Sequence, residues 1–379
     1  MRITICTGPT FAVPPLRGGA VQRVWCGLAP EFVRRGHPVT VFARAHPEQQ
    51  KEEIIDGVVY RRWDGYAQST SIRKDLVRCL FYAVRAARRV PPADVVVTND
   101  FWMPAILPFL QPRAGRVVAN IQRFPKGQFA LYRRCAAILP VSQSVAAAIC
   151  EQTPSVAAKV AVVPNCVDSA FLGPPSADRP ASGSVRLLFV GRLHPEKGLG
   201  LLVGALRTLR ASCAGEWEAC LVGPWQESEG GGGAAYLADL RRLLSGLPVR
   251  VEEPLFQPSA LARVYDSADI FVYPSVAETG EAMPLAPLEA MARGVVPVVS
   301  DLGAFGQYLQ DGGNGVVFNH RGHDAGERLA SALQTLIKDA GLRGRLADAG
   351  RRTAEGFSPA AIAVQYLDVF QRLVGAPPR

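Results

Sequence analysis

Two glutamates eight residues apart are the first side chains of this sequence that could do chemistry. Glu281 and Glu289 lie in the segment ETGEAMPLAPLEAMARG, residues 278–294, whose other side chains are mostly small or apolar. Pro284 predicts a helix over 284–293, with Glu281 just before it and Glu289 about one and a half turns inside. Helical side chains lean toward the N-terminus, so we expect both carboxylates to face one ligand, although helix-dipole compensation would also explain Glu281.

Two cations form a second group. The segment RLLFVGRLHPEKGLGLLVGAL, residues 186–206, predicts a strand that ends at Gly191, a short loop with Arg192 and Lys197, and then a helix. This spacing directs a guanidinium and an ammonium group toward a helix N-terminus, where the dipole favours a diphosphate. The loop matches neither a Walker A sequence nor G-x-G-x-x-G. Two ordinary surface charges remain the alternative.

Glycines mark two further places. Gly18 and Gly19 follow the first predicted strand by a long loop and precede a helical pattern over 20–36. Glycines before a helix let backbone N–H groups approach a phosphate, although glycine pairs also serve in simple turns. The four consecutive glycines at 230–233 instead indicate a flexible loop.

Apolar β-type runs and helical patterns alternate along the whole chain and must position these residues. We expect strands over 2–7, 38–43, 94–98, 116–121, 137–141, 160–164, 185–190, 218–223, 248–251, 269–273 and 295–299, and helices over 19–35, 71–90, 197–211, 234–245, 259–267 and 284–293. This order predicts the α/β class, with two facing Rossmann-like doubly wound domains and a ligand cleft between them. The Pro-, Ser- and Gly-rich segment 166–184 indicates the linker. The first domain would cover 1–170 with a terminal helix over about 358–379, and the second 171–357.

The composition is that of an ordinary globular protein. The 379 residues suit two domains, and 48% of them are hydrophobic and 20% charged. No apolar run reaches the roughly 18 residues that span a bilayer, and the start resembles a strand rather than a signal peptide, so we expect a cytoplasmic protein. The eight cysteines show no C-x-x-C spacing, which favours buried thiols over disulfides or a zinc site.

The net charge of +9 is concentrated in the first half. Residues 1–180 contain 23 Lys and Arg against 12 Asp and Glu, a balance of +11, whereas 181–379 contain 19 against 21. The densest group of basic residues lies in the predicted helix around 70–90. We therefore expect an anionic partner for the first half, and none that is a nucleic acid. For that helix, a solvated face and a membrane-surface patch both remain open.

Four segments of the second half resemble, in order and spacing, the signature of retaining GT-B glycosyltransferases of family 4. They are FVGRLHPEKGL, LVGPW, YDSADIFVYPS and EAMPLAPLEAMARGVVPVVSDLGAF, which begin at residues 189, 221, 265 and 281. In the first half, VPPLRGGAVQRVWCGLAPEFVRRGHPVTVFA and VPNCVDSAF are similar to the family's first loop and helix and to the segment before its linker. GGAVQ and RFPKGQFALYRR resemble bacterial spore-coat-type members.

The resemblance implies a hexosyltransferase of polysaccharide biosynthesis that uses a nucleotide diphosphate sugar and retains its configuration. The acceptor would be a glycan, a lipid-linked sugar or a small molecule, bound mainly by the first domain. Peripheral contact to the inner face of the membrane is a separate expectation, which follows from the basic charge of the first half. In this family pattern, Arg192 and Lys197 stabilise the leaving diphosphate and Glu281 contacts sugar hydroxyls. The implied donor contacts are Gly18, Gly19, Gly191, Gly223, Ala282, Met283, Pro284, Leu285 and Glu289, the last on the ribose. No metal or other cofactor is expected, because the paired cations would replace a metal and the sequence lacks D-x-D.

The sequence departs from the family after the strand over 116–121, where members often carry a histidine and this chain has Gln122. Either Gln122 replaces this histidine or the alignment shifts here. Gln122, Lys126 and Asp100, the last at the carboxyl end of a predicted strand, are the candidate contacts to the acceptor or to the transferred sugar. An Asp100 that only caps a turn remains the alternative.

Three further points concern a competing glutamate, two histidines and the alternative functions. Glu278 competes with Glu281 for the sugar, although the spacing to Glu289 favours Glu281. His320 and His323 lack the third ligand of a metal site. A sugar-nucleotide epimerase and a catalytically silent binding protein, both of the GT-B type, are the alternative functions.

Overall fold

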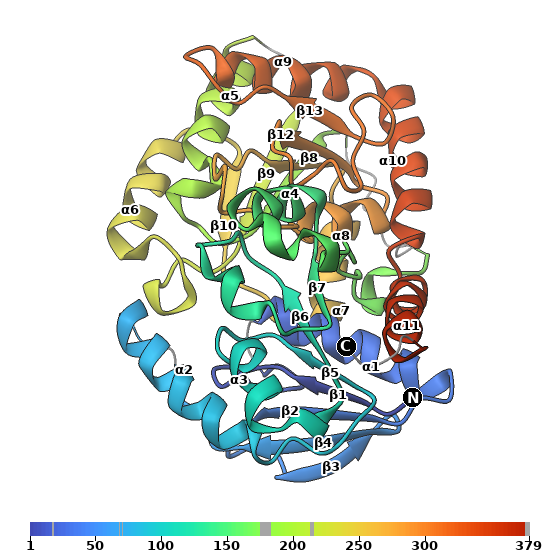
Figure 1. Cartoon of the computed structure of the whole chain (residues 1–379). Helices are drawn as coiled ribbons and strands as arrows, with labels where there is room; N and C mark the ends of the chain where they lie inside the picture. Colours follow the sequence, from blue (N-terminus) through green and yellow to red (C-terminus); the bar gives the residue numbers. More distant parts are fainter. Residues whose placement is uncertain (17–18, 68, 70, 175–182, 213–215, 376–379) are drawn as a thin grey trace. The chain divides into compact units, whose positions relative to one another are not determined.

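The computed structural model describes residues 1–16, 19–67, 69, 71–174, 183–212 and 216–375. The chain forms two compact units. The first unit is Met1–Cys166 with Pro359–Arg379, and the second unit is Val167–Ser358. Each unit holds a largely parallel β-sheet flanked by helices (Figure 1), which confirms the expected α/β class with two Rossmann-like domains.

The first sheet has seven strands in the order β3-β4-β2-β1-β5-β6-β7. Their bounds are β1 Ile3–Cys6, β2 Val39–Arg44, β3 Glu52–Ile55, β4 Val58–Trp63, β5 Val95–Thr98, β6 Arg116–Ile121 and β7 Ala137–Pro140. All neighbours are parallel except β3 and β4, an antiparallel hairpin that the sequence analysis did not predict. Asp56 and Gly57 form its turn with positive φ angles, and this Asp-Gly pair was the available signal.

The strand expected over 160–164 does not form. Two backbone hydrogen bonds of 3.1 Å join this segment to β7, from Ala161 N to Ile138 O and from Val163 N to Pro140 O. Pro140 has no N–H to donate in return, so the ladder does not continue.

Helices of the first unit are α1 Ala20–Arg34, α2 Ile72–Ala87, α3 Met103–Leu110, α4 Gln143–Gln152 and α11 Pro359–Gly375. Helix α11 comes from the far end of the chain and packs beside α1 (Figure 1). The buried Tyr366 fixes it there: its hydroxyl accepts a 2.7 Å hydrogen bond from Asn120 Nδ2 on β6, and its ring lies 5.3 Å from that of Trp25. Aromatic packing and one satisfied buried amide thus explain why the C-terminal helix belongs to the first unit.

The second sheet has six strands, all parallel, in the order β10-β9-β8-β11-β12-β13. Its strands are β8 Val185–Val190, β9 Trp217–Val222, β10 Val249–Glu252, β11 Ile270–Tyr273, β12 Val296–Ser300 and β13 Val316–Phe318. The α-helices are α5 Leu199–Ala211, α6 Gly233–Leu244, α7 Pro258–Asp266, α8 Ala286–Ala292, α9 Ala325–Lys338 and α10 Ala340–Glu355. Strands β8 and β11 are neighbours, so the segments that follow them meet at one edge of the sheet, where parallel α/β sheets bind ligands.

Helix α8, which carries Glu289, begins at Ala286 rather than at 284 as predicted. Pro287 explains the shift, because a proline, which lacks an N–H, fits only the first turn of a helix. Glu289 therefore lies in the first turn of α8, and the prediction that it lies about one and a half turns inside was wrong.

An ion pair anchors α8 to α7. Arg293 Nε and Nη2 donate to the two carboxylate oxygens of Asp266 at 2.7 and 2.6 Å, and both side chains are 7% exposed. This bidentate geometry fixes the end of α8 and with it the helix that carries Glu289.

The predicted linker is partly packed. Phe171 is fully buried, and its ring lies 5.7 Å from that of Tyr265 in the second unit. Residues 175–182 lie outside the described residues.

Two expectations from the composition concern the cysteines and a membrane-spanning helix. Four of the seven described cysteines are buried and three are half-buried, and none of the seven forms a disulfide. Burial is thus less complete than predicted, and Cys213 is not described. No described helix is long and apolar enough to cross a membrane.

Candidate active site

The candidate cations follow β8. Arg192 lies in the loop that follows β8. Lys197 is the last residue of the one-turn 3-10 helix η5, Pro195–Lys197. Backbone packing is close here, since a Cβ on Gly223 would lie only 1.8 Å from Gly191 O. The loops after β8 and β9 therefore touch at two of the candidate glycines, and no larger residue fits at position 223.

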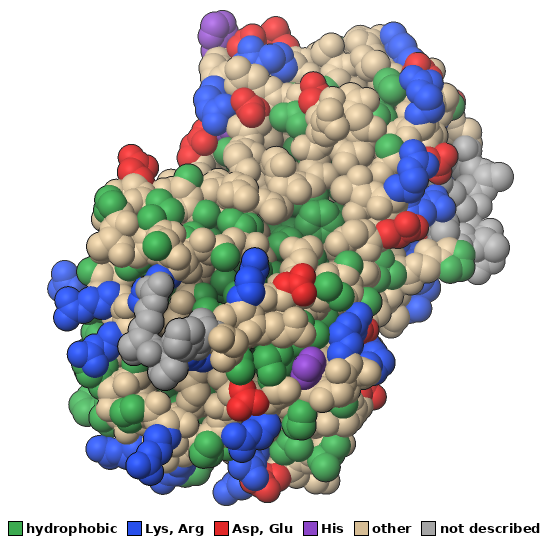
Figure 2. Space-filling view, turned by 45° about the vertical axis from the view of Figure 1, so that its right-hand side comes forward, with side chains coloured by type: hydrophobic (Ala, Val, Ile, Leu, Met, Phe, Trp, Pro, Cys, Tyr) green, Lys and Arg blue, Asp and Glu red, His purple; other side chains and the backbone are tan. Residues whose placement is uncertain are grey.

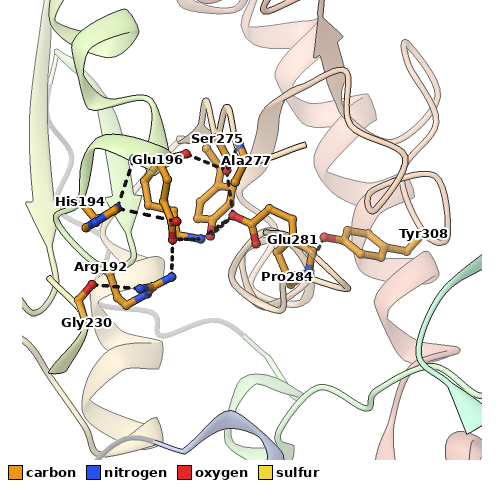
Figure 3. A network of polar contacts seen from close by, with 11 residues as sticks. Arg192, His194, Glu196, Gly230, Ser275, Ala277, Glu281, Pro284 and Tyr308 are labelled. Carbon is orange, nitrogen blue, oxygen red and sulfur yellow. Dashed lines mark hydrogen bonds and ion pairs between the residues drawn. The ribbon is translucent and has the colours of Figure 1, made fainter. Parts of the chain in front are cut away.

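Arg192 is held by two partners (Figure 3). Its Nη1 donates a 2.9 Å hydrogen bond to Gly230 O, and its Nη2 forms an ion pair with Glu196. Glu196 Oε1 also lies 3.8 Å from Lys197 Nζ. The side chain of Arg192 remains 40% exposed, so an anion can reach it from solvent.

The four glycines at 230–233, expected to be flexible, form a defined turn. Gly232 N donates a 2.8 Å hydrogen bond to Leu193 O, and a Cβ on Gly231 would lie 2.2 Å from the Trp225 backbone. Only glycine permits this approach, and the turn presents the carbonyl of its first residue to the guanidinium.

Glu281, labelled in Figure 3, forms a buried ion pair with Lys197. Glu281 Oε1 accepts hydrogen bonds from Lys197 Nζ, from Ser275 Oγ at 2.8 Å and from Tyr273 OH at 3.1 Å. No described residue donates to its Oε2. Burial, reinforced by the charge of Glu281, raises the pKa of Tyr273 well above its usual value, so the phenol stays protonated as a donor.

Glu289 is the second buried carboxylate, with 6% of its surface exposed. Its Oε2 accepts a 3.0 Å hydrogen bond from Tyr265 OH. Burial and the charges of both Glu281 and Glu289 raise the pKa of Tyr308, which places the two carboxylates near the same phenol.

The turn between the glutamates contains the other candidate donor contacts, Ala282, Met283, Pro284 and Leu285. Met283 and Pro284 are buried, and Tyr308 OH donates a 2.7 Å hydrogen bond to Pro284 O. Tyr308 thus supports the turn.

Sequence reasoning missed Tyr308, Tyr273 and Ser275. The last two stand in the quoted YDSADIFVYPS segment at the end of β11, where side chains of a parallel sheet meet ligands, so their position was the available signal. Nothing in the sequence around Tyr308 indicated its contact.

Glu278, the competitor of Glu281, has other partners. Its carboxylate binds Arg321 at 2.9 and 3.0 Å and lies 3.0 Å from His320 Nε2. These contacts also lower the pKa of Glu278, chiefly through the hydrogen bond from Arg321. Its side chain is 54% exposed, whereas that of Glu281 is 7% exposed.

Asp100 lies at the carboxyl end of β5 in the first unit. Its Oδ1 accepts hydrogen bonds from Trp102 N at 3.0 Å and Met103 N at 2.7 Å, at the start of α3. Its Oδ2 is buried without a partner among the described residues. Burial raises the pKa of Asp100 to about 6, and the two backbone bonds oppose this rise.

Gln122 is fully engaged within the first unit. Its Nε2 donates to Asn165 Oδ1 at 2.9 Å, and Asn165 Nδ2 donates back to Gln122 Oε1 at 2.8 Å.

The remaining candidates of the first unit are Lys126 and the two glycines before α1. Lys126 is exposed. Gly19 precedes α1 with φ 102°, and its neighbour Gly18 lies outside the described residues.

Comparisons with known proteins show the family of this chain. The family model described as glycosyl transferases group 1 matches residues 177–353, and that described as Glycosyltransferase Family 4 matches residues 17–171. The chain thus belongs to the family-4-type glycosyltransferases of the GT-B fold, which confirms the resemblance seen in the sequence.

Individual relatives cover nearly the whole chain. Spore coat protein SA of Bacillus subtilis is 24% identical over 98% of this chain and all of its own. The phosphatidyl-myo-inositol mannosyltransferase of Mycolicibacterium smegmatis is 26% identical over 99% of this chain and 95% of its own. Anabaena HepE, solved in complex with UDP and glucose, has a TM-score of 0.73 at 18% identity and covers 98% of this chain and 100% of its own. The last similarity concerns the fold alone.

Proposed function

We propose that this glycosyltransferase transfers a hexose from a nucleoside diphosphate sugar and retains its anomeric configuration. The observation that carries the proposal is the grouping of Arg192, Lys197 and Glu281 beside β8 and β11. A guanidinium and an ammonium group suit a leaving diphosphate, and the complex of Anabaena HepE with UDP and glucose supports this class of donor.

Glu281 supports retention without an enzyme nucleophile. One of its oxygens already accepts three hydrogen bonds, including the one from Lys197, which weakens it as a nucleophile. The other oxygen is the acceptor that a sugar hydroxyl would use. Glu289 would then bind the ribose hydroxyls, because a buried carboxylate accepts two such bonds.

The proposed reaction needs no metal. Arg192 and Lys197 supply the positive charge that must compensate the departing diphosphate as the glycosidic bond breaks. Excess chelator should therefore leave the transfer rate unchanged.

An anionic acceptor, such as a phosphate-bearing glycan or a lipid-linked sugar, suits the first unit. Residues 101–150 contain six Lys and Arg and no Asp or Glu. Figure 2 shows basic side chains in separate groups on one face of the protein. The mannosyltransferase of Mycolicibacterium smegmatis, whose name gives a phosphatidyl-inositol acceptor, supports this choice.

Helix α2 would hold the first unit at the inner face of the cytoplasmic membrane. Val77 and Phe81, one helical turn apart, are 55% and 65% exposed. Lys74, Arg78 and Arg85 are exposed on the same side of the helix by their spacing. Apolar and cationic side chains on one face suit an anionic lipid surface.

A donor screen tests the proposal. The protein is incubated with UDP-, GDP- and ADP-hexoses, and the release of free nucleotide is measured with and without candidate acceptors. One donor should be consumed far faster than the others, and the sugar bond of the product should have the donor's configuration by NMR. Inversion would overturn the retaining assignment, and no turnover of any donor would leave a silent binding protein as the better account.

A further inference from the structure

Glu196 lies between the two cations of the proposed donor site (Figure 3). Its Oε1 pairs with Arg192 Nη2 and lies 3.8 Å from Lys197 Nζ. Its backbone is held in place, since Glu196 O accepts a 2.9 Å hydrogen bond from Val276 N. The backbone of Glu196 thus holds its carboxylate beside the two cations.

The network is electrically balanced as it stands. Arg192 and Lys197 contribute two positive charges, and Glu196 and Glu281 contribute two negative ones. A diphosphate that approaches meets cations that are already neutralised. For the diphosphate to bind tightly, one of the two carboxylates must therefore break its ion pair with a cation.

The two carboxylates differ in how easily a diphosphate could displace them from their cations. Glu281 is 7% exposed and accepts three hydrogen bonds on one oxygen, so its displacement would break all three and leave the buried Lys197 with only the more distant Glu196. The Glu196 side chain is 33% exposed and can turn into water. Arg192 would meanwhile keep its place, because its Nη1 stays bonded to Gly230 O.

We infer that Glu196 is a resident counter-ion that competes with the donor diphosphate for Arg192. The inference rests on the proposed function and names a regulation of the same site. A bound diphosphate takes the place of the Glu196 carboxylate at Arg192. After sugar transfer, Glu196 pairs with Arg192 again and speeds the release of the nucleoside diphosphate.

The variant Glu196→Gln tests this role, because it keeps the shape and removes the charge. Its affinity for UDP, GDP or ADP should rise about three- to tenfold, as expected for the loss of a competing, partly exposed ion pair. The gain should shrink at high salt and be smaller for the nucleoside monophosphate. Glu196→Asp, which keeps the charge, should return toward the wild-type affinity.

Glu355→Gln is the matched control, since it makes the same charge change at an exposed position on α10. It should leave nucleotide affinity unchanged. A purely structural role of Glu196 predicts the opposite result, namely a lower thermal midpoint and weaker nucleotide binding in Glu196→Gln. Equal or weaker binding by Glu196→Gln overturns the inference.

Inorganic pyrophosphate separates this inference from the proposed function. If the wild type binds pyrophosphate but no nucleotide, the proposed donor is wrong, and the pyrophosphate affinities of the variants still decide the role of Glu196. If the wild type binds neither, both proposals fall.

Discussion

Lys197 Nζ donates to Glu281 Oε1 across 84 positions of sequence, and their side chains are only 6% and 7% exposed. A buried charge pair of this kind gives modest net stability, but the loss of one partner is expensive. Glu281 therefore holds a cation of the proposed diphosphate site in place, and in the proposed reaction its other oxygen would accept a hydrogen bond from the sugar.

Replacement of Glu281 should affect both stability and turnover. Glu281→Gln removes the direct, buried counter-charge of Lys197 and leaves only the half-exposed Glu196 at 3.8 Å, so we expect the free energy of unfolding to fall by up to about 3–5 kcal/mol. Transfer should slow by about 100-fold or more, because bonds to the sugar tighten as positive charge develops on its ring. Denaturant unfolding and single-donor kinetics measure the two effects.

A double-mutant cycle provides the control for this prediction. Glu281→Gln with Lys197→Met removes both charges and should be less destabilised than the sum of the single variants. Additive losses, or full activity in a folded Glu281→Gln protein, would contradict the role given to this pair.

Glu289→Ala should chiefly weaken nucleotide binding. The proposed bonds to ribose hydroxyls would exist in the ground state and the transition state alike, so the affinity should fall about tenfold or more while turnover at saturating donor changes little. Calorimetry with the nucleoside diphosphate measures this. Tyr265→Phe, which removes the hydroxyl that contacts Glu289 Oε2 and Ala286 O but keeps the carboxylate, is the control. Unchanged affinity in Glu289→Ala would refute the ribose contact.

Asp100 should make stability fall as the pH rises from about 4 to 6. Its pKa is raised to about 6 by burial, so the folded state binds the proton more tightly than the unfolded state does. Its contribution is present below the usual pKa of an aspartate and disappears as the pH passes the raised value. Asp100→Asn should flatten this part of the melting-temperature profile by a few degrees. Identical slopes in both proteins would argue against the raised pKa.

The exposed apolar residues of α2 should drive membrane binding. Val77→Ser with Phe81→Ser should reduce co-sedimentation with vesicles that contain anionic lipid several-fold at low salt. Ile54→Ser is the matched control, because Ile54 is 72% exposed on β3 of the same unit. Equal losses in both variants, or no retention of the wild type, would refute a specific α2 surface.

The positions of the candidate site residues along the secondary structure could largely be predicted from the sequence. Arg192 and Lys197 follow a clear β-type run, and the spacing of Glu281 to Glu289 is local. Their mutual pairing could not be predicted, because Lys197 and Glu281 meet only through the tertiary fold of the second unit. For the same reason, Tyr308 carried no recognisable signal.

Errors in the fold expectations had local causes. The hairpin β3-β4 was missed although Asp56 and Gly57 marked its turn. The strand over 160–164 failed because its neighbour ends in Pro140, which cannot donate. The start of α8 was misplaced because the sequence offers two prolines, and Pro287 rather than the earlier one lies in the first turn.

The most direct test of the central claim is the kcat/KM for sugar transfer by Arg192→Ala, measured with excess chelator and the donor found in the screen. The matched control is Arg241→Ala, at an exposed position on α6. We predict that Arg192→Ala lowers kcat/KM by about 100-fold or more, since removal of one preorganised charge-stabilising donor has effects of that size. The control should match the wild type. Two results would contradict a site in which paired cations stabilise the leaving diphosphate. One is transfer by Arg192→Ala at the wild-type rate, and the other is loss of transfer by the wild type when metal is removed.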